Sequence, residues 1–171
     1  LEDWAALGPL CQPPPGSKRF MSVNLSAPEV CRPGIGQAVR AALDARRVPA
    51  TDLRIELTET SLVANKEVVA EVMQRLLAQG VSIALDDFGK GFSGMDYLQS
   101  MPFSCIKIDK SFIDGVLNAE RSRHIVRTAI DLAHTLGMTT VGEGIEDDAT
   151  AQALLEMGCT YGQGYFFAKP M

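Results

Sequence analysis

Seven polar residues fall within short apolar runs of the sequence or at the C-terminal ends of those runs. They are Asn24, Glu56, Asp86, Asp87, Lys107, Glu143 and Gln163. In a parallel barrel the carboxyl ends of the strands form one mouth, where enzymes of that architecture place their catalytic groups. Charges scattered at random would favour helix faces and loops instead, so the pattern predicts a chemical site at such a mouth.

Carboxylates gathered at one mouth need cations, because like charges a few ångströms apart oppose ionisation. The acidic residues of this set are accompanied by amides and by one ammonium, Lys107, but by no histidine or cysteine. Oxygen ligands of this kind indicate a hard ion, Mg²⁺ or Mn²⁺, rather than zinc. Two such ions bridged by Asp86 would clamp the attacking and leaving oxygens of a phosphodiester.

Each of these residues also has a structural interpretation that the sequence alone leaves open. Glu56 could alternate outward to solvent from its strand, and Asp86 and Asp87 could simply belong to a turn. Lys107 could extend its charge to solvent from a half-buried strand, and Glu143 could be an acid beside a helix start. The functional interpretation depends on the convergence of all of them at one edge.

The elements that must position these residues alternate short apolar runs with longer segments of helical period. The expected strands cover residues 20–25, 53–57, 81–85, 105–108, 139–141 and 161–167, and the expected helices cover residues 35–46, 66–79, 95–100, 121–136 and 149–157. This alternation is typical of βα units and a parallel sheet. It predicts an α/β fold, a TIM-like (β/α) barrel that is incomplete in this chain, because a closed barrel has eight strands in about 250 residues. An open doubly wound sheet has little support, since no glycine fingerprint follows the first strand.

Length and composition favour one globular domain over residues 1–171. The chain is 46% hydrophobic and 22% charged, and no apolar stretch reaches the roughly 18 residues of a bilayer crossing. No signal peptide opens it, so a cytoplasmic location is expected, although a longer protein could still be tethered to a membrane. A net charge of −5 argues against a nucleic-acid polymer as partner. The four scattered cysteines predict buried, reduced thiols. Residues 1–7 resemble the end of a helix, so an upstream segment is expected.

Six short motifs, in this order, resemble the EAL family from about residue 4 to residue 170. They are Ser22-Val23-Asn24-Leu25-Ser26, Glu56-Leu57-Thr58-Glu59, Asp86-Asp87-Phe88-Gly89, Lys107-Ile108-Asp109, Gly142-Glu143-Gly144-Ile145-Glu146 and Gln163-Gly164-Tyr165. The resemblance implies a TIM-like barrel that hydrolyses the bacterial second messenger cyclic di-GMP to linear pGpG. It places this chain in the C-terminal two-thirds of such a domain.

The resemblance also implies how the residues share two divalent ions. Asn24, Glu56 and Asp86 would be ligands of one ion, and Asp86 with Asp87 would serve the other. Glu143 would belong to the same cluster of metal and water.

Catalytic and supporting roles follow from the same resemblance. Lys107 would orient or activate the attacking water, and Glu143 is a candidate base. Glu59 would pin the glycine-rich loop that follows Asp87, so that residues 88–94 can position ligands and respond to dimerisation. The residues implied to support the loop and the substrate site are Glu59, Phe88, Gly89, Glu146 and Gln163.

Departures from the family pattern qualify what the chain can do. The Glu-Ala-Leu motif, which implies a further metal-ligand glutamate and an arginine for the substrate phosphate, is absent from these residues. We therefore expect this stretch alone to be poorly active or inactive, as part of a longer phosphodiesterase. Smaller departures are Gly142 in place of a usual alanine, Lys90 in the loop, and Gly94 in place of a common serine.

Two other functions remain open at this point. One is a catalytically inactive receptor that binds cyclic di-GMP and signals through partner domains, which the retained carboxylates argue against. The other is a barrel lyase with Lys107 as a Schiff base, which has little support. The resemblance further implies a homodimer formed through the barrel and an upstream sensory or GGDEF-type domain.

Overall fold

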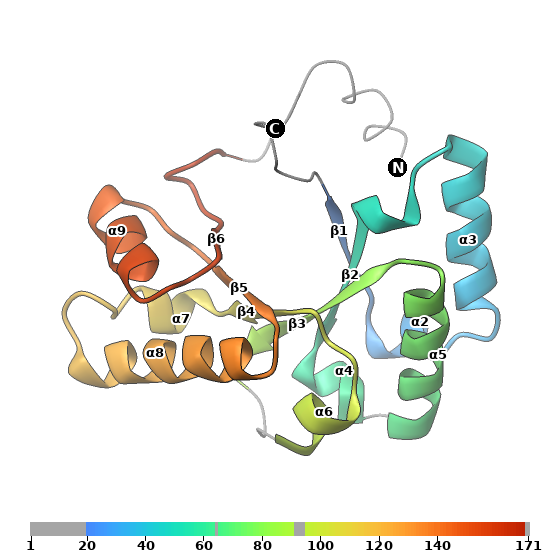
Figure 1. Ribbon diagram of the computed structural model, residues 1–171, viewed down its shortest axis with the longest axis horizontal. Helices are drawn as coiled ribbons and strands as arrows, with labels where there is room; N and C mark the ends of the chain where they lie inside the picture. Colours follow the sequence, from blue (N-terminus) through green and yellow to red (C-terminus); the bar gives the residue numbers. More distant parts are fainter. Residues whose placement is uncertain (1–19, 64, 91–94, 170–171) are drawn as a thin grey trace. The chain divides into compact units, whose positions relative to one another are not determined.

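The computed structural model describes residues 20–63, 65–90 and 95–169, in which strands and helices alternate (Figure 1). The strands are β1 (Met21–Asn24), β2 (Leu53–Thr58), β3 (Ser82–Phe88), β4 (Cys105–Ile108), β5 (Thr139–Gly142) and β6 (Tyr161–Gly162). The helices are α2 (Ala27–Val30), α3 (Ile35–Arg46), the 3-10 helix η1 (Ala50–Asp52), α4 (Glu59–Val63), α5 (Lys66–Ala78), α6 (Met95–Ser100), α7 (Lys110–Ile113), α8 (Glu120–Thr135) and α9 (Asp148–Glu156).

The chain divides into two compact units. The first ends at Ile83 and also includes Asp96–Pro102, and the second is formed by Ala84–Met95 and by the chain from Phe103 onward. Within the first unit β1 and β2 pair in parallel. Within the second unit β3, β4, β5 and β6 pair in parallel, each with the next. The α/β class and the parallel strands predicted from the sequence are confirmed.

The first unit is held together by helices packed on its two strands. Helix α5 begins after Asn65, whose side chain accepts a hydrogen bond from Val68 N, and it is followed by Gly80 with φ 94°. These are the capping residues that helix ends favour. The buried side chains of α5 are Val69, Val72, Met73 and Leu76. Val68 is half-buried, at the edge of this buried stripe.

The second unit is built around helix α8, which packs against β4 and β5 (Figure 1). Its buried side chains are Val126, Ala129, Ile130 and Ala133, which repeat at helical spacing, whereas Leu136, also expected on this face, is 39% exposed. Val126, Ala129 and Ile130 join a core that includes Ile108, Ile145 and Leu154. Because these apolar contacts fix β4 and β5, the residues that follow each strand are held on a rigid base.

The prediction of a strand over residues 161–167 is wrong in its length. Only Tyr161–Gly162 is strand, and the backbone turns at Gly164, whose carbonyl accepts a hydrogen bond from Phe167 N at 3.1 Å. The turn lets Phe166 N donate to Ile145 O at 3.0 Å, so the aromatic residues close back on the preceding loop. Apolar content alone had suggested a continuous strand.

Several other expectations fall differently in the structure. Helices α2, α4 and α7 were not predicted, because segments of four or five residues show no helical period.

Cys105 and Cys159 are free and buried as expected, whereas Cys31 is free and half-buried. The helix expected over residues 1–7 and the loop residues 91–94 lie outside the described residues. Among the helices that the structure describes, none is long and apolar enough to cross a bilayer.

Substitution of Gly164 by alanine is expected to destabilise the second unit strongly. A Cβ built on Gly164 would overlap the backbone of Ile145, which cannot move as the tip of a side chain can. We expect the free energy of unfolding to fall by about 2–4 kcal/mol, measured by denaturant titration. Gly36→Ala is the control, because its Cβ would meet neighbours only at 3.8 Å or more and helical alanine is favoured by about 0.5–1 kcal/mol. Equal stability of the Gly164→Ala and wild-type proteins would contradict the packing described here.

Candidate functional site

The end of β3 carries the two neighbouring carboxylates of Asp86 and Asp87. The strand runs through Phe88, beyond the expected end at residue 85, and its register with β4 shifts between Leu85 and Phe88. Asp87 has φ 55°, a left-handed conformation that aspartate tolerates better than most residues. A bulge of this kind re-aims side chains. It therefore decides where the two carboxylates point.

Lys107 of β4 lies between two of the predicted carboxylates. Its Nζ is 3.0 Å from Asp86 Oδ1 and 2.7 Å from Glu143 Oε1, and only 6% of its side chain is exposed. Glu143 directly follows β5, and its backbone N donates to Ile108 O at 3.1 Å. A buried ammonium requires such charged partners. The structure thus brings together side chains from β3, β4 and the end of β5, and it does not extend Lys107 to solvent.

Glu143 belongs both to the group formed by Asp86, Lys107 and Glu143 and to a second group of carboxylates. One ligand oxygen from each of Asp87, Asp109 and Glu143 lies within 4.8 Å of the other two. Asp109 follows β4 directly and was not among the predicted site residues, although the strand-end rule that selected the others also applies to it. The possible metal ligands from Asp87, Asp109 and Glu143 are all carboxylate oxygens, which fit a hard divalent cation.

Lys90 is the other charged residue at this cluster. Its Nζ is 2.6 Å from Asp109 Oδ2 and 3.0 Å from Asp87 Oδ1. The hydrogen bonds to Asp109 and then to Asp87 raise the pKa of Lys90 above its usual value. Burial would raise the pKa of Asp109, but hydrogen bonds from Lys90 and Ser111 outweigh it and lower that pKa to about 2. Both partners are therefore charged at neutral pH.

Phe88 and Gly89 shape the backbone that carries these carboxylates. Phe88 is half-buried and packs against the core around α8. Gly89 has φ 99°, and a Cβ there would lie 2.7 Å from Cε2 of Phe112. Glycine is required at this position for both reasons, which supports the loop-positioning role predicted for it.

Glu146 and Gln163 lie at the edge of the described site. Glu146 forms an ion pair with Lys110, and both side chains are exposed. The side chain of Gln163 is also exposed, while its backbone N donates to Gly142 O at 2.9 Å. Gly142 stands where the family usually has alanine, and here a Cβ would come within 2.8 Å of Cδ1 of Leu154. Support of the substrate site by Glu146 and Gln163 stays a prediction.

The remaining predicted residues belong to the first unit. Asn24 and Glu56 are register partners on β1 and β2, so their side chains belong to neighbouring positions of one sheet edge. Glu56 is only 5% exposed, which excludes the interpretation that it simply points to solvent. Glu59 begins α4 immediately after β2. The roles of Asn24 and Glu56 as metal ligands, and of Glu59 in pinning the loop after Asp87, stay predictions.

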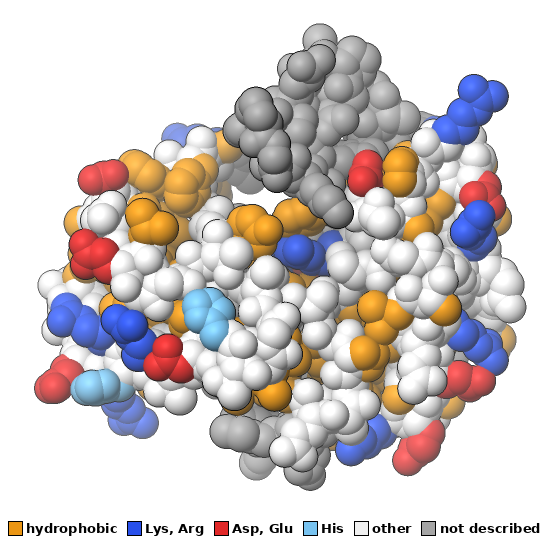
Figure 2. Space-filling model, viewed as in Figure 1, with side chains coloured by type: hydrophobic (Ala, Val, Ile, Leu, Met, Phe, Trp, Pro, Cys, Tyr) orange, Lys and Arg blue, Asp and Glu red, His pale blue; other side chains and the backbone are white. Residues whose placement is uncertain are grey.

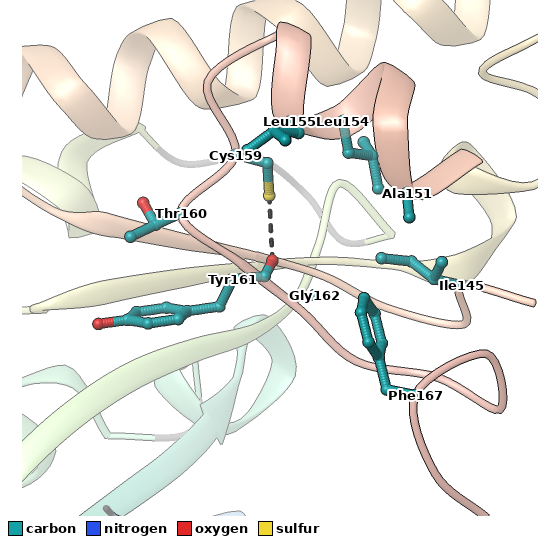
Figure 3. A pocket seen from close by; sticks show the side chains of 9 residues that line it. All are labelled: Ile145, Ala151, Leu154, Leu155, Cys159, Thr160, Tyr161, Gly162 and Phe167. Atoms are coloured by element: carbon teal, nitrogen blue, oxygen red, sulfur yellow. Dashed lines mark hydrogen bonds between the residues drawn. The ribbon is translucent and has the colours of Figure 1, made fainter. Parts of the chain in front are cut away.

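An apolar pocket of about 220 Å³ lies at β6 and α9, apart from this chemistry (Figure 3). It is lined by Ile145, Ala151, Leu154, Leu155, Cys159, Thr160, Tyr161, Gly162 and Phe167. Ligand pockets usually measure about 300–1,000 Å³ and carry a few convergent polar groups. Polar groups of its lining are engaged within the protein: Cys159 Sγ donates to Tyr161 O at 3.2 Å, and Thr160 Oγ1 accepts from Thr140 N at 3.1 Å. The pocket is therefore a poor candidate for a nucleotide site.

The surface charges are mixed in sign. On the face drawn in Figure 2, Lys and Arg side chains of the described residues are interspersed with Asp and Glu. Ion pairs such as Arg40 with Asp44 and Arg75 with Glu71 are part of this pattern. Positive charge that tracks a phosphate backbone is normally clustered on one face. The prediction that no nucleic-acid polymer binds still depends on the net charge of the sequence.

Comparison with known proteins supports a single family. The family model described as EAL domain matches residues 3–170. Cyclic di-GMP phosphodiesterase RocR of Pseudomonas aeruginosa is 34% identical over 151 residues, which are 88% of this chain and 38% of RocR. The chain spans between 19% and 51% of the length of such curated relatives.

Solved structures agree with this match. The PaMucR phosphodiesterase in complex with c-di-GMP has a TM-score of 0.84 and 34% identity, covering 89% of this chain and 62% of that chain. The EAL enzyme Bd1971 with cAMP and cyclic di-GMP bound has a TM-score of 0.86 and 32% identity, covering 89% and 40%. These neighbours confirm the predicted TIM-like (β/α) barrel, of which the described residues supply six strands. The chain belongs to the EAL domain family.

Proposed function

We propose that the protein carrying this chain is a phosphodiesterase that hydrolyses cyclic di-GMP to pGpG with the help of two divalent cations, Mg²⁺ or Mn²⁺. The observation that carries the proposal is the buried Lys107 between Asp86 and Glu143, beside the carboxylates of Asp87 and Asp109. Two similar proteins support it. RocR is named a cyclic di-GMP phosphodiesterase, and PaMucR is a phosphodiesterase in complex with c-di-GMP.

The cations would be held by oxygen donors of this chain. In the second unit the candidate ligands are the carboxylates of Asp86, Asp87, Asp109 and Glu143. The family resemblance adds Asn24 and Glu56 of the first unit as further candidates. When bound, the cations supply charge neutralisation at the phosphodiester and activation of a water. The number of carboxylates fits such ions, because without them this many ionised groups would oppose each other.

Lys107 and Glu143 handle water and protons at this site. Glu143 is the candidate base, whose carboxylate takes a proton from the attacking water. Lys107 holds Glu143 and Asp86 in place through its ion pairs, and its ammonium would stabilise negative charge on a water or a phosphate oxygen beside them. The same pairing disfavours a Schiff-base lyase, which needs an amine free to attack a carbonyl.

The partners of the protein are proposed on the same grounds. MucR of Pseudomonas aeruginosa, named a bifunctional diguanylate cyclase and cyclic di-GMP phosphodiesterase, is 34% identical over 151 residues, which are only 22% of its length. This supports an upstream GGDEF-type or sensory domain in the whole protein. A homodimer formed through the barrel and a cytoplasmic location follow from the family resemblance and the sequence.

Hydrolysis of cyclic di-GMP tests the proposed function directly. The protein extended with its upstream residues is incubated with the nucleotide and Mg²⁺ or Mn²⁺, and pGpG is quantified by chromatography. We expect pGpG with either ion and none after chelation, because the carboxylates cannot act on the phosphodiester unaided. Nucleotide binding without pGpG would favour the inactive receptor, and absence of both would contradict the proposal.

Excess Ca²⁺ serves as the ion control in the same assay. Ca²⁺ is larger and accepts six to eight ligands in flexible geometry, so it should spoil the spacing that the two smaller ions require. We expect the rate to fall by at least about tenfold. An unchanged rate in excess Ca²⁺ would count against the two-ion site.

A further inference from the structure

Lys90 forms ion pairs with Asp87 and Asp109, two of the three carboxylates that could hold a metal ion. Its Nζ contacts Asp109 Oδ2 at 2.6 Å and Asp87 Oδ1 at 3.0 Å. The third member of the cluster, Glu143, is engaged by Lys107 at 2.7 Å. Each carboxylate of the cluster is therefore already paired with an ammonium from the chain itself.

The backbone after β3 aims Lys90 at this place. Lys90 N donates to Asp87 O at 3.2 Å, which closes a turn of four residues. The turn uses the positive φ angles of Asp87 and Gly89, and Phe112 packs where a Cβ on Gly89 would lie. Because Lys90 follows Asp87 by only three residues in this turn, its side chain reaches the carboxylate of Asp87.

An ammonium and a divalent cation cannot share these oxygens. A divalent ion would need carboxylate oxygens at about 2.0–2.6 Å, in the space where the lysine nitrogen now lies. Two cations that close to each other repel, and each needs the same lone pairs.

We propose that Lys90 is a tethered cation that occupies the Asp87–Asp109 carboxylate pair and must leave before a divalent ion binds there. The inference rests on the metal site of the proposed function and goes beyond it. Residue 90 then sets the affinity of this site for metal, and the carboxylates are neutralised when the metal is absent.

The burial of the partners suits such an exchange. The side chain of Lys90 is 52% exposed, so it can swing into solvent, whereas Asp109 is 8% exposed and remains in place. Asp109 is further fixed because its Oδ1 accepts a hydrogen bond from Ser111 N at 2.9 Å. Lys90 can therefore leave while the Asp109 carboxylate stays in place; the Asp87 side chain is 40% exposed and is held less firmly.

Binding of Mn²⁺ to the nucleotide-free protein tests the proposal without any enzymatic assay. Electron paramagnetic resonance titration of free Mn²⁺ gives the affinity of the wild-type, Lys90→Met and Lys90→Arg proteins. We expect Lys90→Met to bind Mn²⁺ about threefold to thirtyfold more tightly, as two partly exposed ion pairs no longer compete. Lys90→Arg keeps the positive charge and should stay within about twofold of wild type.

Lys110→Met is the matched control for loss of a lysine charge. Lys110 also bridges two carboxylates, Glu146 and Asp114, and its side chain is 46% exposed. Neither partner belongs to the three-carboxylate cluster. We expect the affinity for Mn²⁺ to change by less than about twofold, since screened charges outside the site act weakly.

Thermal unfolding separates competition from a merely structural ion pair. In chelator, Lys90→Met should unfold at a lower temperature than wild type, because the carboxylates lose their cation. In saturating Mn²⁺ the difference should vanish or reverse. A structural ion pair would lower the melting temperature equally under both conditions.

The outcomes are distinct from those of the hydrolysis assay. Equal Mn²⁺ affinity of wild type and Lys90→Met, or the same gain in Lys90→Arg, overturns the inference and leaves the proposed function standing. Tighter binding in Lys90→Met without hydrolysis by any variant supports the inference and overturns the proposed function. No Mn²⁺ binding by any variant overturns both.

Discussion

Replacement of Asp86 by asparagine is expected to lower the rate of cyclic di-GMP hydrolysis by about a hundredfold or more. Asp86 Oδ1 lies 3.0 Å from the buried Nζ of Lys107, and the side chain is 14% exposed. Asparagine has nearly the same shape, so the fold should persist. It lacks the negative charge, so its amide oxygen would be a weaker ligand for the proposed metal ion, and one of the two ion pairs of Lys107 is lost.

The measurement compares pGpG formation by the two proteins over a range of Mg²⁺ concentrations. A ligand defect should raise the concentration of metal required for half of the maximal rate. Asp44→Asn is the control, because Asp44 is a surface carboxylate, 61% exposed, paired with Arg40 at 2.9 Å. Full activity of the Asp86→Asn protein would overturn the assignment of Asp86 to the metal site.

Substitution of Lys107 by methionine is expected to lower the rate of hydrolysis by roughly 10²–10⁴-fold. The side chain contacts Asp86 and Glu143 at once and is 6% exposed, so no solvent cation takes its place in the same geometry. Methionine fills a similar volume but supplies no N–H donor for a water or a phosphate oxygen. Glu143, the candidate base, also loses its ion pair with Lys107.

The same substitution should change stability in a way that depends on metal. Without the ammonium, two partly buried carboxylates face each other, and we expect unfolding in chelator to become easier by about 1–3 kcal/mol. Added Mn²⁺ should restore part of this loss. Lys107→Arg keeps the charge and is expected to preserve stability but not the rate, since its planar group is larger and differently shaped. Activity of Lys107→Met within a few-fold of wild type would contradict its role.

Local patterns were sufficient for most of the elements. The segments 35–46 and 105–108 were predicted with the bounds that α3 and β4 have in the structure. A helix that buries one face must repeat its apolar residues every three or four positions, and this period is visible without any knowledge of the partner surface. Segments of four or five residues, such as α7, carry no such period and were not predicted.

Patterns failed where contacts from elsewhere in the chain decide the backbone. The aromatic run after Gly162 suggested a longer strand, yet the chain turns at Gly164 because Phe166 returns to the backbone of Ile145. The bulge that re-aims Asp86 and Asp87 also depends on the register between β3 and β4. Neither feature has a signal within its own segment.

Part of the candidate site could likewise be predicted from the sequence, and part was missed. Strand-end positions selected Asp86, Asp87, Lys107 and Glu143 correctly as neighbours, because parallel strands end at one edge whatever their distance in sequence. Asp109 obeyed the same rule and was passed over.

By itself, the sequence determined the order of the strands and of the longer helices, the family, and the residues that stand at strand ends, since all of these follow from spacing along the chain. Only the tertiary structure decided which charges meet. It paired Lys107 with Asp86 and Glu143, and it placed Lys90 on Asp87 and Asp109. The reason is physical: an ion pair depends on the distance between side chains, and that distance is set by register, bulge and turn rather than by residue type.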